Sequence, residues 1–193
     1  MAYNPDVIES GECTNNNIIA GYPTRAMFIK DCDVTAVPER KTTDEAPSDK
    51  CAMTGKFVFK DTRRPTFIDA IEQTPHYAAA TQGETGSESF APTFEFATKD
   101  KVEADAFAAD VLNQPGYMVF QEYDGRQMMV GNKLLKCKVI ANFDSGTAVT
   151  DAKRYSFTVS VAAAFTPKQY LVTPINMEAP EGETPYDPYP AEG

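Results

Sequence analysis

Apolar and polar residues alternate most regularly in the second half of the chain. In residues 154–165 the odd-numbered positions are apolar, and the even-numbered positions carry polar or small side chains. Residues 134–143 alternate in the same way, except that Ile140 adds an apolar side chain to the polar face. Alternation of this length predicts two half-buried antiparallel strands. The residues between them, from Asp144 to Asp151, should form a long hairpin connection.

Two shorter β-rich runs precede these strands. Tyr117–Tyr123 and Arg126–Val130 flank Asp124-Gly125, a pair that favours a type I′ turn because both of its central residues need a positive φ. Gly131-Asn132 should then turn the chain into the next strand. We therefore expect the four runs to form one continuous antiparallel meander from residue 117 to residue 165.

A helical period replaces the alternation in residues 100–113. Asp100 is placed to act as the N-cap, with Glu103 at the spacing of a capping box. Pro115-Gly116 should end the helix. The apolar stripe expected to pack on one sheet consists of Ala104, Phe107, Ala108, Val111 and Leu112.

Further strands are expected nearer the N-terminus. Residues 90–96 alternate between aromatic or proline and smaller or polar positions, and Pro92 should place the start of this strand at a sheet edge or a bulge. Ala26–Lys30 and Lys56–Lys60 are the other candidates. Together with the meander and the single helix, they predict a mainly β fold, a β-sandwich or partly closed barrel of antiparallel strands with one flanking α-helix.

Three polar segments interrupt or follow this pattern. Residues 37–55 and 78–89 are rich in Thr, Ser, Gly, Pro and acidic residues, which predicts long mobile loops. Residues 174–193 hold five prolines and five acidic residues but no Lys or Arg. This acidic tail is either disordered or an extended arm that becomes ordered on a neighbouring subunit, with Tyr186 and Tyr189 as its anchors.

The expected organisation is therefore one β-sandwich domain with two extensions. Residues 1–25 form an N-terminal arm, residues 26–173 the sandwich and residues 174–193 the C-terminal arm. A length of 193 residues and a hydrophobic content of 42% suit a single packed domain.

The charge and the terminal sequence restrict the possible partners and location. The 18 basic and 28 acidic residues give a net charge of −10, and half of it lies in the acidic tail. Such a chain does not suit nucleic-acid binding by phosphate neutralisation. The first residues show no basic start leading into an apolar stretch, and no apolar run approaches the roughly 18 residues that span a bilayer. We expect a protein made in a cytoplasm, without a membrane partner.

The cysteines and the lone histidine do not form a recognisable metal site. The cysteines lie far apart with no C-x-x-C pair, which indicates reduced, partly buried thiols. They are Cys13, Cys32, Cys51 and Cys137. Asp31-Cys32-Asp33 could offer metal ligands, but a solvated turn is the better interpretation.

No catalytic constellation emerges either. His76 lies in a Thr-Pro-His-Tyr segment, and the chain has no G-x-S-x-G motif and no glycine-rich phosphate loop before its helix. We interpret His76 as an ordinary loop residue, Arg63-Arg64 as a surface salt-bridge partner and Asp44-Glu45 as a solvated pair. The sequence thus predicts no enzyme, no catalytic or metal site and no cofactor.

Short motifs follow one another in a distinctive order over residues 117–171, about a quarter of the chain. They are Tyr117-Met118-Val119-Phe120, Asp124-Gly125-Arg126, Val130-Gly131-Asn132, Tyr155-Ser156-Phe157-Thr158-Val159, Pro167 and Tyr170-Leu171. This order resembles structural proteins of tailed phages and prophages, particularly those of Bacteroidetes hosts, and it is most similar to their tail tube proteins. The acidic tail and the first 55 residues do not match that pattern.

The resemblance implies a virion subunit of the phage tail. Such proteins are two-sheet sandwiches or barrels that form hexameric rings, and the inner sheets of a ring join into one wall around a lumen. Rings stack through long loops and terminal arms, and DNA passes the like-charged wall without specific binding. Two alternatives stay open: a head decoration, head–tail connector or tail-completion protein, and, from another class, a β-sandwich ligand-binding module.

Overall fold

The computed structural model describes residues 22–43, 45–147, 152–180 and 186–189. Its largest element is a seven-stranded sheet with the strand order β3-β4-β13-β10-β9-β1-β6. All its pairs are antiparallel except β13 with β4. The strands are Glu39–Arg40 (β3), Ala52–Thr54 (β4), Tyr170–Leu171 (β13), Gln127–Val130 (β10), Gly116–Gln121 (β9), Arg25–Lys30 (β1) and Thr66–Asp69 (β6).

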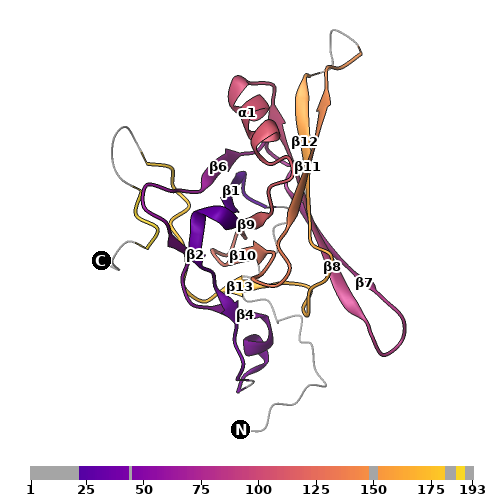
Figure 1. Cartoon of the computed structure of the whole chain (residues 1–193). Coiled ribbons are helices and arrows are strands. Elements are labelled where there is room, and N and C mark those ends of the chain that lie inside the picture. Colours follow the sequence, from indigo (N-terminus) through magenta and orange to yellow (C-terminus); the bar gives the residue numbers. More distant parts are fainter. Residues whose placement is uncertain (1–21, 44, 148–151, 181–185, 190–193) are drawn as a thin grey trace, which may run out of the picture.

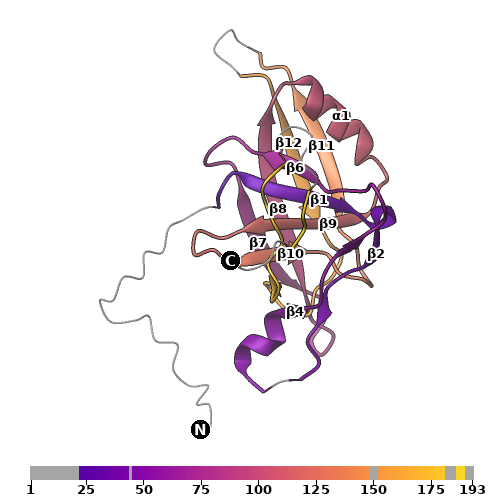
Figure 2. The same ribbon diagram turned by 90° about the vertical axis from the view of Figure 1, so that its left-hand side faces the viewer.

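A four-stranded sheet packs against one face of the seven-stranded sheet (Figure 1). Its order is β11-β12-β8-β7, and every neighbouring pair is antiparallel. The strands are Lys138–Asp144 (β11), Arg154–Ser160 (β12), Ser89–Lys99 (β8) and His76–Gln82 (β7). The strands of the two sheets cross at a steep angle (Figure 2).

The remaining elements are short. Val34–Ala36 (β2) pairs with Val58–Phe59 (β5), and two 3₁₀ turns span Asp31–Asp33 (η1) and Pro47–Cys51 (η2). The helix α1 spans Val102–Asp110 and is the only α-helix in the described ranges. Among the described residues, the outer strands of both large sheets pair on one side only, so neither sheet closes into a barrel. The predicted fold class, a mainly β sandwich with one helix, is confirmed.

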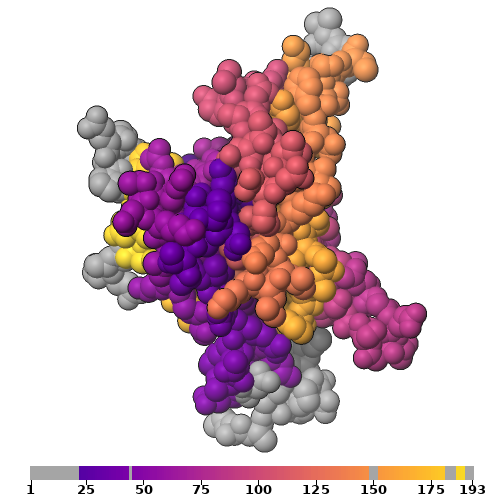
Figure 3. All heavy atoms as spheres, in the orientation of Figure 1, coloured from indigo at the N-terminus to yellow at the C-terminus, as the bar shows by residue number. Residues whose placement is uncertain are grey.

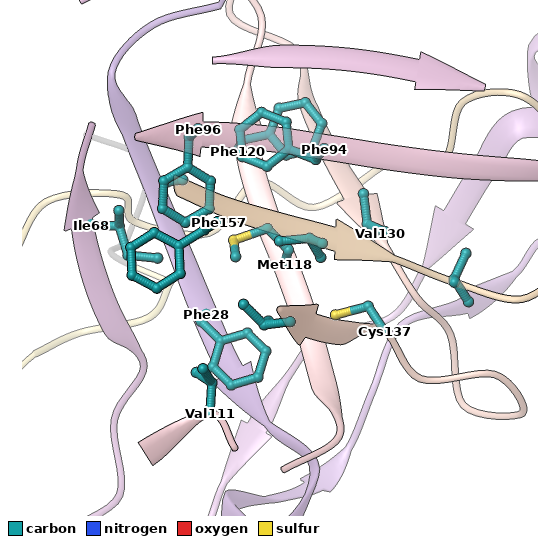
Figure 4. Packing of buried hydrophobic residues seen from close by; sticks show 14 of the residues in the cluster. Phe28, Ile68, Phe94, Phe96, Val111, Met118, Phe120, Val130, Cys137 and Phe157 are labelled. Atoms are coloured by element: carbon teal, nitrogen blue, oxygen red, sulfur yellow. The ribbon is translucent and has the colours of Figure 1, made fainter. Parts of the chain in front are cut away.

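Aromatic side chains fill the space between the two sheets. Phe94 and Phe96 from β8 and Phe157 from β12 meet Phe120 and Met118 from β9 (Figure 4). The helix covers one end of this core by placing the Phe107 ring 5.9 Å from Phe28 and 5.2 Å from Phe157. Burial of these large apolar surfaces is the main force that holds the two sheets together.

A second core lies on the opposite face of the seven-stranded sheet. Its central strands β1, β9 and β10 are buried on both faces, which explains their nearly continuous apolar sequences. The second core contains Met27, Ile29, Tyr117, Val119 and Met129 from these strands, with Phe57, Ile175 and Met177 packed over them. The molecule therefore has three layers, not two.

Residues 174–180 and 186–189 belong to this third layer, although the sequence suggested a tail (Figure 2). The Gln127 side chain donates a hydrogen bond to the Ile175 carbonyl and accepts one from its N–H, each at 2.7 Å. The Phe57 N–H donates to the Tyr189 hydroxyl at 2.6 Å, and the Tyr186 hydroxyl donates to the Asn176 carbonyl at 2.7 Å. Both tyrosines thus anchor this segment on its own chain.

The predicted four-strand meander is wrong. β9 and β10 form a hairpin in the seven-stranded sheet, whereas β11 and β12 form a hairpin in the other sheet. The chain crosses between the sheets after β10 at Gly131, which adopts a φ of +95°. A side chain there would approach the Cys137 backbone nitrogen to 2.9 Å, so glycine permits this close crossing. Continuous alternation cannot reveal such a change of sheet.

Several strand limits and turns also differ from expectation. β12 ends at Ser160 and not at residue 165, and β11 begins at Lys138 after a turn. Among the described residues, the non-glycine residues with positive φ do not include Asp124, so the β9–β10 hairpin has no type I′ turn. Instead the Gly125 N–H donates to the Glu122 carbonyl at 3.0 Å, and within this turn only Gly125 has a positive φ.

Pro92 and the polar segments also differ from expectation. Pro92 lies within β8, an inner strand, at the point where the pairing of β8 with β12 stops. Residues 78–82 belong to β7, which folds back on β8, whereas residues 83–88 form the turn between these two strands. Residues 37–55 contain β3, η2 and β4. Small and polar residues form strands here because the backbone pairing, not side-chain burial, holds them.

The predicted helix exists but is shorter than expected. Its N-cap is Lys101, not Asp100, and no side chain caps it. Ala104 and Phe107 are buried as predicted, while Leu112 is exposed. The predicted strand at residues 26–30 is confirmed as β1, whereas only Val58–Phe59 of residues 56–60 form a strand.

Candidate assembly surface

The outer face of the four-stranded sheet is not covered by any element of the described chain. This outer face is the side of the sheet that lies away from the seven-stranded sheet (Figure 1), and it carries the side chains of alternate residues of each strand. Half of them are Ala, Ser or Thr, and all except Ala97 are exposed or half-buried. They are Lys138, Ile140, Asn142 and Asp144 of β11, Arg154, Ser156, Thr158 and Ser160 of β12, Ser89, Ala91, Thr93, Glu95, Ala97 and Lys99 of β8, and His76, Ala78, Ala80 and Gln82 of β7.

The strand register arranges this face in rows across the sheet. One row places Arg154 between Asp144 and Lys99, so that this basic residue has one acidic and one basic neighbour. Lys138 and Glu95 lie in other rows, apart from each other. The face thus carries three cationic and two anionic side chains, and its formal charge is close to neutral.

Within the described ranges, both outer strands of this sheet leave an edge unpaired, although Cys137, just before β11, exchanges backbone hydrogen bonds with Gly116 of β9. β7 and β11 are the outer members of the sheet, and each is seven residues long. An unpaired edge offers a row of backbone N–H and C=O groups to another strand. The open edges of the seven-stranded sheet are shorter: β3 has two residues and β6 has four. The longest edges available for pairing therefore flank the uncovered face.

Parts of the four-stranded sheet project beyond the body of the molecule (Figure 3). The β7–β8 hairpin extends at one end and the β11–β12 hairpin at the other. Phe143 belongs to the core-facing side of β11, yet 52% of its surface is exposed because this end of the strand extends past the core. Its ring lies 5.0 Å from that of Tyr155, whose hydroxyl donates a hydrogen bond to Asp105 of α1.

A hollow of about 390 Å³ lies beside β3 and β4. Its walls are mainly apolar, with Met53 at the base and Phe165 and Leu134 at the rim, where they are 68% and 81% exposed. The Arg40 guanidinium lies 5.4 Å above the centre of the Phe165 ring. The buried Oε1 of Gln169, another lining residue, has no hydrogen-bond partner in the part of the chain that the structure describes. This hollow could hold a small ligand with an apolar body.

Asp31-Cys32-Asp33, which could have offered metal ligands, forms a 3₁₀ turn. The Tyr117 hydroxyl donates to Asp31 Oδ1 at 2.6 Å, and burial together with this bond raises the pKa of the Tyr117 phenol. Asp33 pairs with Arg63 at 3.5 Å, as the salt-bridge interpretation of Arg63 predicted. Cys32 is exposed beside them. No group of three or more metal-ligating side chains occurs in the described ranges.

The other candidates do not converge on one site. His76 lies on β7 and faces outward in the row of Glu95, so it belongs to a strand and not to a loop. Asp44 and Cys13 lie outside the described residues. Cys51 is a half-buried free thiol, and burial raises the pKa of the Cys137 thiol to about 12.

Sequence reasoning predicted the edge strand β11 but missed the edge strand β7, most of which it placed in a loop. Residues 78–82 read Ala-Ala-Ala-Thr-Gln, which is not typical of a strand. The only signal was the preceding His-Tyr, because Tyr77 can bury its ring against Phe120, 5.6 Å away.

No described helix is long and apolar enough to cross a membrane. Searches for matching family models, curated proteins and solved structures found none.

Proposed function

We propose that this chain is a structural subunit of a phage virion that assembles into rings, and that these rings stack as a tail tube and form a conduit for DNA. The observation that carries the proposal is the pair of seven-residue open edges on either side of an uncovered sheet face. A surface of this kind suits joining to further copies of the same sheet. The resemblance of residues 117–171 to tail tube proteins supports the same function.

The number of strands favours a closed ring. All three pairs in the sheet are antiparallel, so its two outer strands, the first and fourth across the sheet, run in opposite directions. Rotation about an axis roughly along the strands therefore brings β7 of one copy antiparallel to β11 of the next. Where the rotation closes on itself, repeating one such heterologous contact gives a ring and removes the unpaired edges from every copy.

The uncovered face would line the lumen of this ring. Six copies would give a wall of 24 strands, with a radius of about 23 Å for strands about 4.8 Å apart and tilted by about 36°. Small side chains keep such a lumen wide. A nearly neutral face neutralises few phosphates, so a DNA duplex would pass without being held.

Electron microscopy of the purified full chain at high concentration tests the proposal. We expect rings or tubes from the parent chain, and monomers from Ala80→Lys, which adds a charge at the exposed edge strand β7. Ala36→Lys adds the same charge to the exposed strand β2, outside the four-stranded sheet, and should assemble like the parent. A parent chain that stays strictly monomeric at millimolar concentration would overturn the proposal.

The form of the assembly separates related virion functions. Stacked rings agree with a tail tube, whereas single rings that do not stack would favour a head–tail connector or a tail-completion protein. A ligand-binding module is the second candidate because of the apolar hollow beside β3. It would be favoured if the chain stayed monomeric and a fluorescent apolar probe bound with an affinity that Phe165→Ser lowered.

A further inference from the structure

The hydrogen bonds of β8 determine which way its backbone groups point. Alternate residues of a strand direct their N–H and C=O groups to opposite sides. Phe90 exchanges both backbone bonds with Ala164, beyond the end of β12, at 2.9 and 2.7 Å. Ala97 instead accepts the Ile71 N–H at 2.8 Å, on the β7 side. Even-numbered residues of β8 therefore bond towards β12, and odd-numbered residues bond towards β7.

The registers carry this alternation to both edges of the sheet. Glu95 is odd-numbered and lies opposite His76, so even-numbered residues of β7 bond inward to β8. Phe96 lies opposite Phe157 and bonds to it, so even-numbered residues of β12 bond to even-numbered residues of β11. The backbone groups directed to the open edges belong to Tyr77, Ala79 and Thr81 of β7 and to Val139, Ala141 and Phe143 of β11.

Building on the proposed self-assembly, we propose one specific register for the contact between copies. β7 of one copy pairs antiparallel with β11 of the next over all seven residues, with Ala79 opposite Ala141 at the centre. His76 then lies opposite Asp144, and Gln82 lies opposite Lys138. This register brings the outward-directed backbone groups of the two edges together in three residue pairs, and each pair can exchange two hydrogen bonds.

The side chains agree with this register on both faces of the sheet. Each outer-face residue of β7 meets an outer-face residue of β11, so the bare face continues from copy to copy. On the other face Tyr77 lies opposite Phe143, which covers the exposed Phe143 ring with an aromatic partner. On the outer face, Ala80 lies opposite the exposed Ile140 and Ala78 lies opposite Asn142, so small residues of β7 meet larger residues of β11.

The register also yields a plausible barrel geometry. Ala141 shares a row with Phe157 and Phe96, whereas Ala79 shares a row with Pro92. From Phe96 to Pro92 is a shift of four residues, so each four-stranded copy adds a stagger of four residues. A stagger of four residues over four strands is one residue per strand. An eight-stranded barrel with a shear of 8 has the same stagger per strand, and its strands tilt by about 36°. This tilt lies at the lower end of the usual range of about 35–45°.

Other registers fit less well. A slip by one residue would place outer-face side chains against core-facing ones. A slip by two residues keeps the faces but loses two of the seven residue pairs. It also changes the stagger to two or six residues per copy, which corresponds to tilts of roughly 20° or 45°. The full-length register alone combines seven pairs, matched faces and the covered Phe143 ring.

Disulfide trapping in the assembled full chain tests the register. Ala78→Cys with Asn142→Cys would place two cysteines directly opposite each other across the contact, within the Cα separation of about 4.4–6.8 Å that a disulfide requires. β8 and β12 separate the two positions within one chain, so the disulfide must join two copies. The background carries Cys13→Ser, Cys32→Ser and Cys51→Ser to prevent other crosslinks.

Two slipped pairs serve as matched controls. Ala80→Cys with Asn142→Cys, and Ala78→Cys with Ile140→Cys, are diagonal neighbours about 7–8 Å apart in the proposed register. We expect a ladder of covalent oligomers on a non-reducing gel from the opposite pair, at least tenfold stronger than from either control. An equal or stronger ladder from a control, or no ladder in assemblies seen by microscopy, would overturn the register but not the ring. Absence of assembly in the parent would overturn both.

Discussion

The Phe94 ring of the four-stranded sheet lies flat on the Phe120 ring of the seven-stranded sheet. Their centroids are 4.0 Å apart, and their planes differ by 5°. Tyr22 meets Phe120 edge-on at 5.2 Å, and Tyr77 lies 5.6 Å from it. This aromatic cluster joins β8, β7 and β9, so the edge strand β7 is held in place by the core although its own sequence is mostly small. The rigidity of the proposed assembly edge depends on this contact.

The core position of Phe157 leads to the first prediction. Its ring stacks on Phe96 at 5.1 Å and contacts Phe107 of the helix at 5.2 Å. Phe157→Ala should lower the free energy of unfolding by ~3–5 kcal/mol, because a large cavity opens between the sheet and the helix. Urea unfolding measures the change. Thr158→Ala, on the outer face of the same strand, is the control and should cost far less; equal losses would contradict the assigned faces.

Gln127 should hold the C-terminal segment on the second core. Gln127→Met removes both hydrogen bonds to Ile175 and leaves the backbone N–H and C=O of Ile175 without these partners. Unpaired buried groups cost about 1–3 kcal/mol, so we expect lower stability and faster hydrogen exchange in residues 174–180. Gln114→Met, at an exposed position, should change neither. Unchanged exchange after Gln127→Met would show that apolar contacts alone hold the segment.

Stability should fall as the pH rises above 9, partly through Cys137. Burial raises the pKa of this thiol from its ordinary value of 9.0 to about 12. Between these values the unfolded chain loses the proton and the folded chain keeps it, so the unfolded state binds fewer protons. The free energy of unfolding then decreases by up to about 1.4 kcal/mol per pH unit.

Urea unfolding of the parent and of Cys137→Ala at pH 8, 9 and 10 measures this contribution. The parent should lose more stability between pH 9 and pH 10 than the variant does. The buried tyrosines, such as Tyr117 and Tyr77, also have pKa values raised above their ordinary value of 10.0. They lower the stability mainly above pH 10 and equally in both chains, so the difference between the two chains reports on the thiol. Identical slopes for the two chains would mean that the thiol is accessible to solvent in the folded protein.

The uncovered face should bind double-stranded DNA only weakly when the protein is assembled. Glu95→Lys changes the face from two anionic and three cationic side chains to one and four, and it should introduce DNA binding that weakens as salt is added. Glu178→Lys makes the same change in total charge on the exposed C-terminal segment. It should bind little more DNA than the parent. Tight, salt-sensitive binding by the parent would argue against a conduit.

The sequence alone determined the local structure wherever side-chain burial and backbone pairing coincide. Alternation identified the core-facing residues Phe157 and Val159 and the buried face of β11 around Val139, because one side of each strand packs on the core. The helical period placed Phe107 under α1 for the same reason. The mainly β sandwich class with one helix follows from these patterns.

Only the tertiary structure decided how these elements are joined. Gly131 takes the chain from one sheet to the other, and a local pattern reads the same on either side of such a crossing. Ile175 and Met177 lie in a proline-rich acidic segment, and they are buried because β1, β9 and β10 present a second apolar face to them. β7 is a strand because β8 offers it backbone bonds and the core holds Tyr77. Pairing and burial between distant segments depend on the whole chain, so no local pattern encodes them.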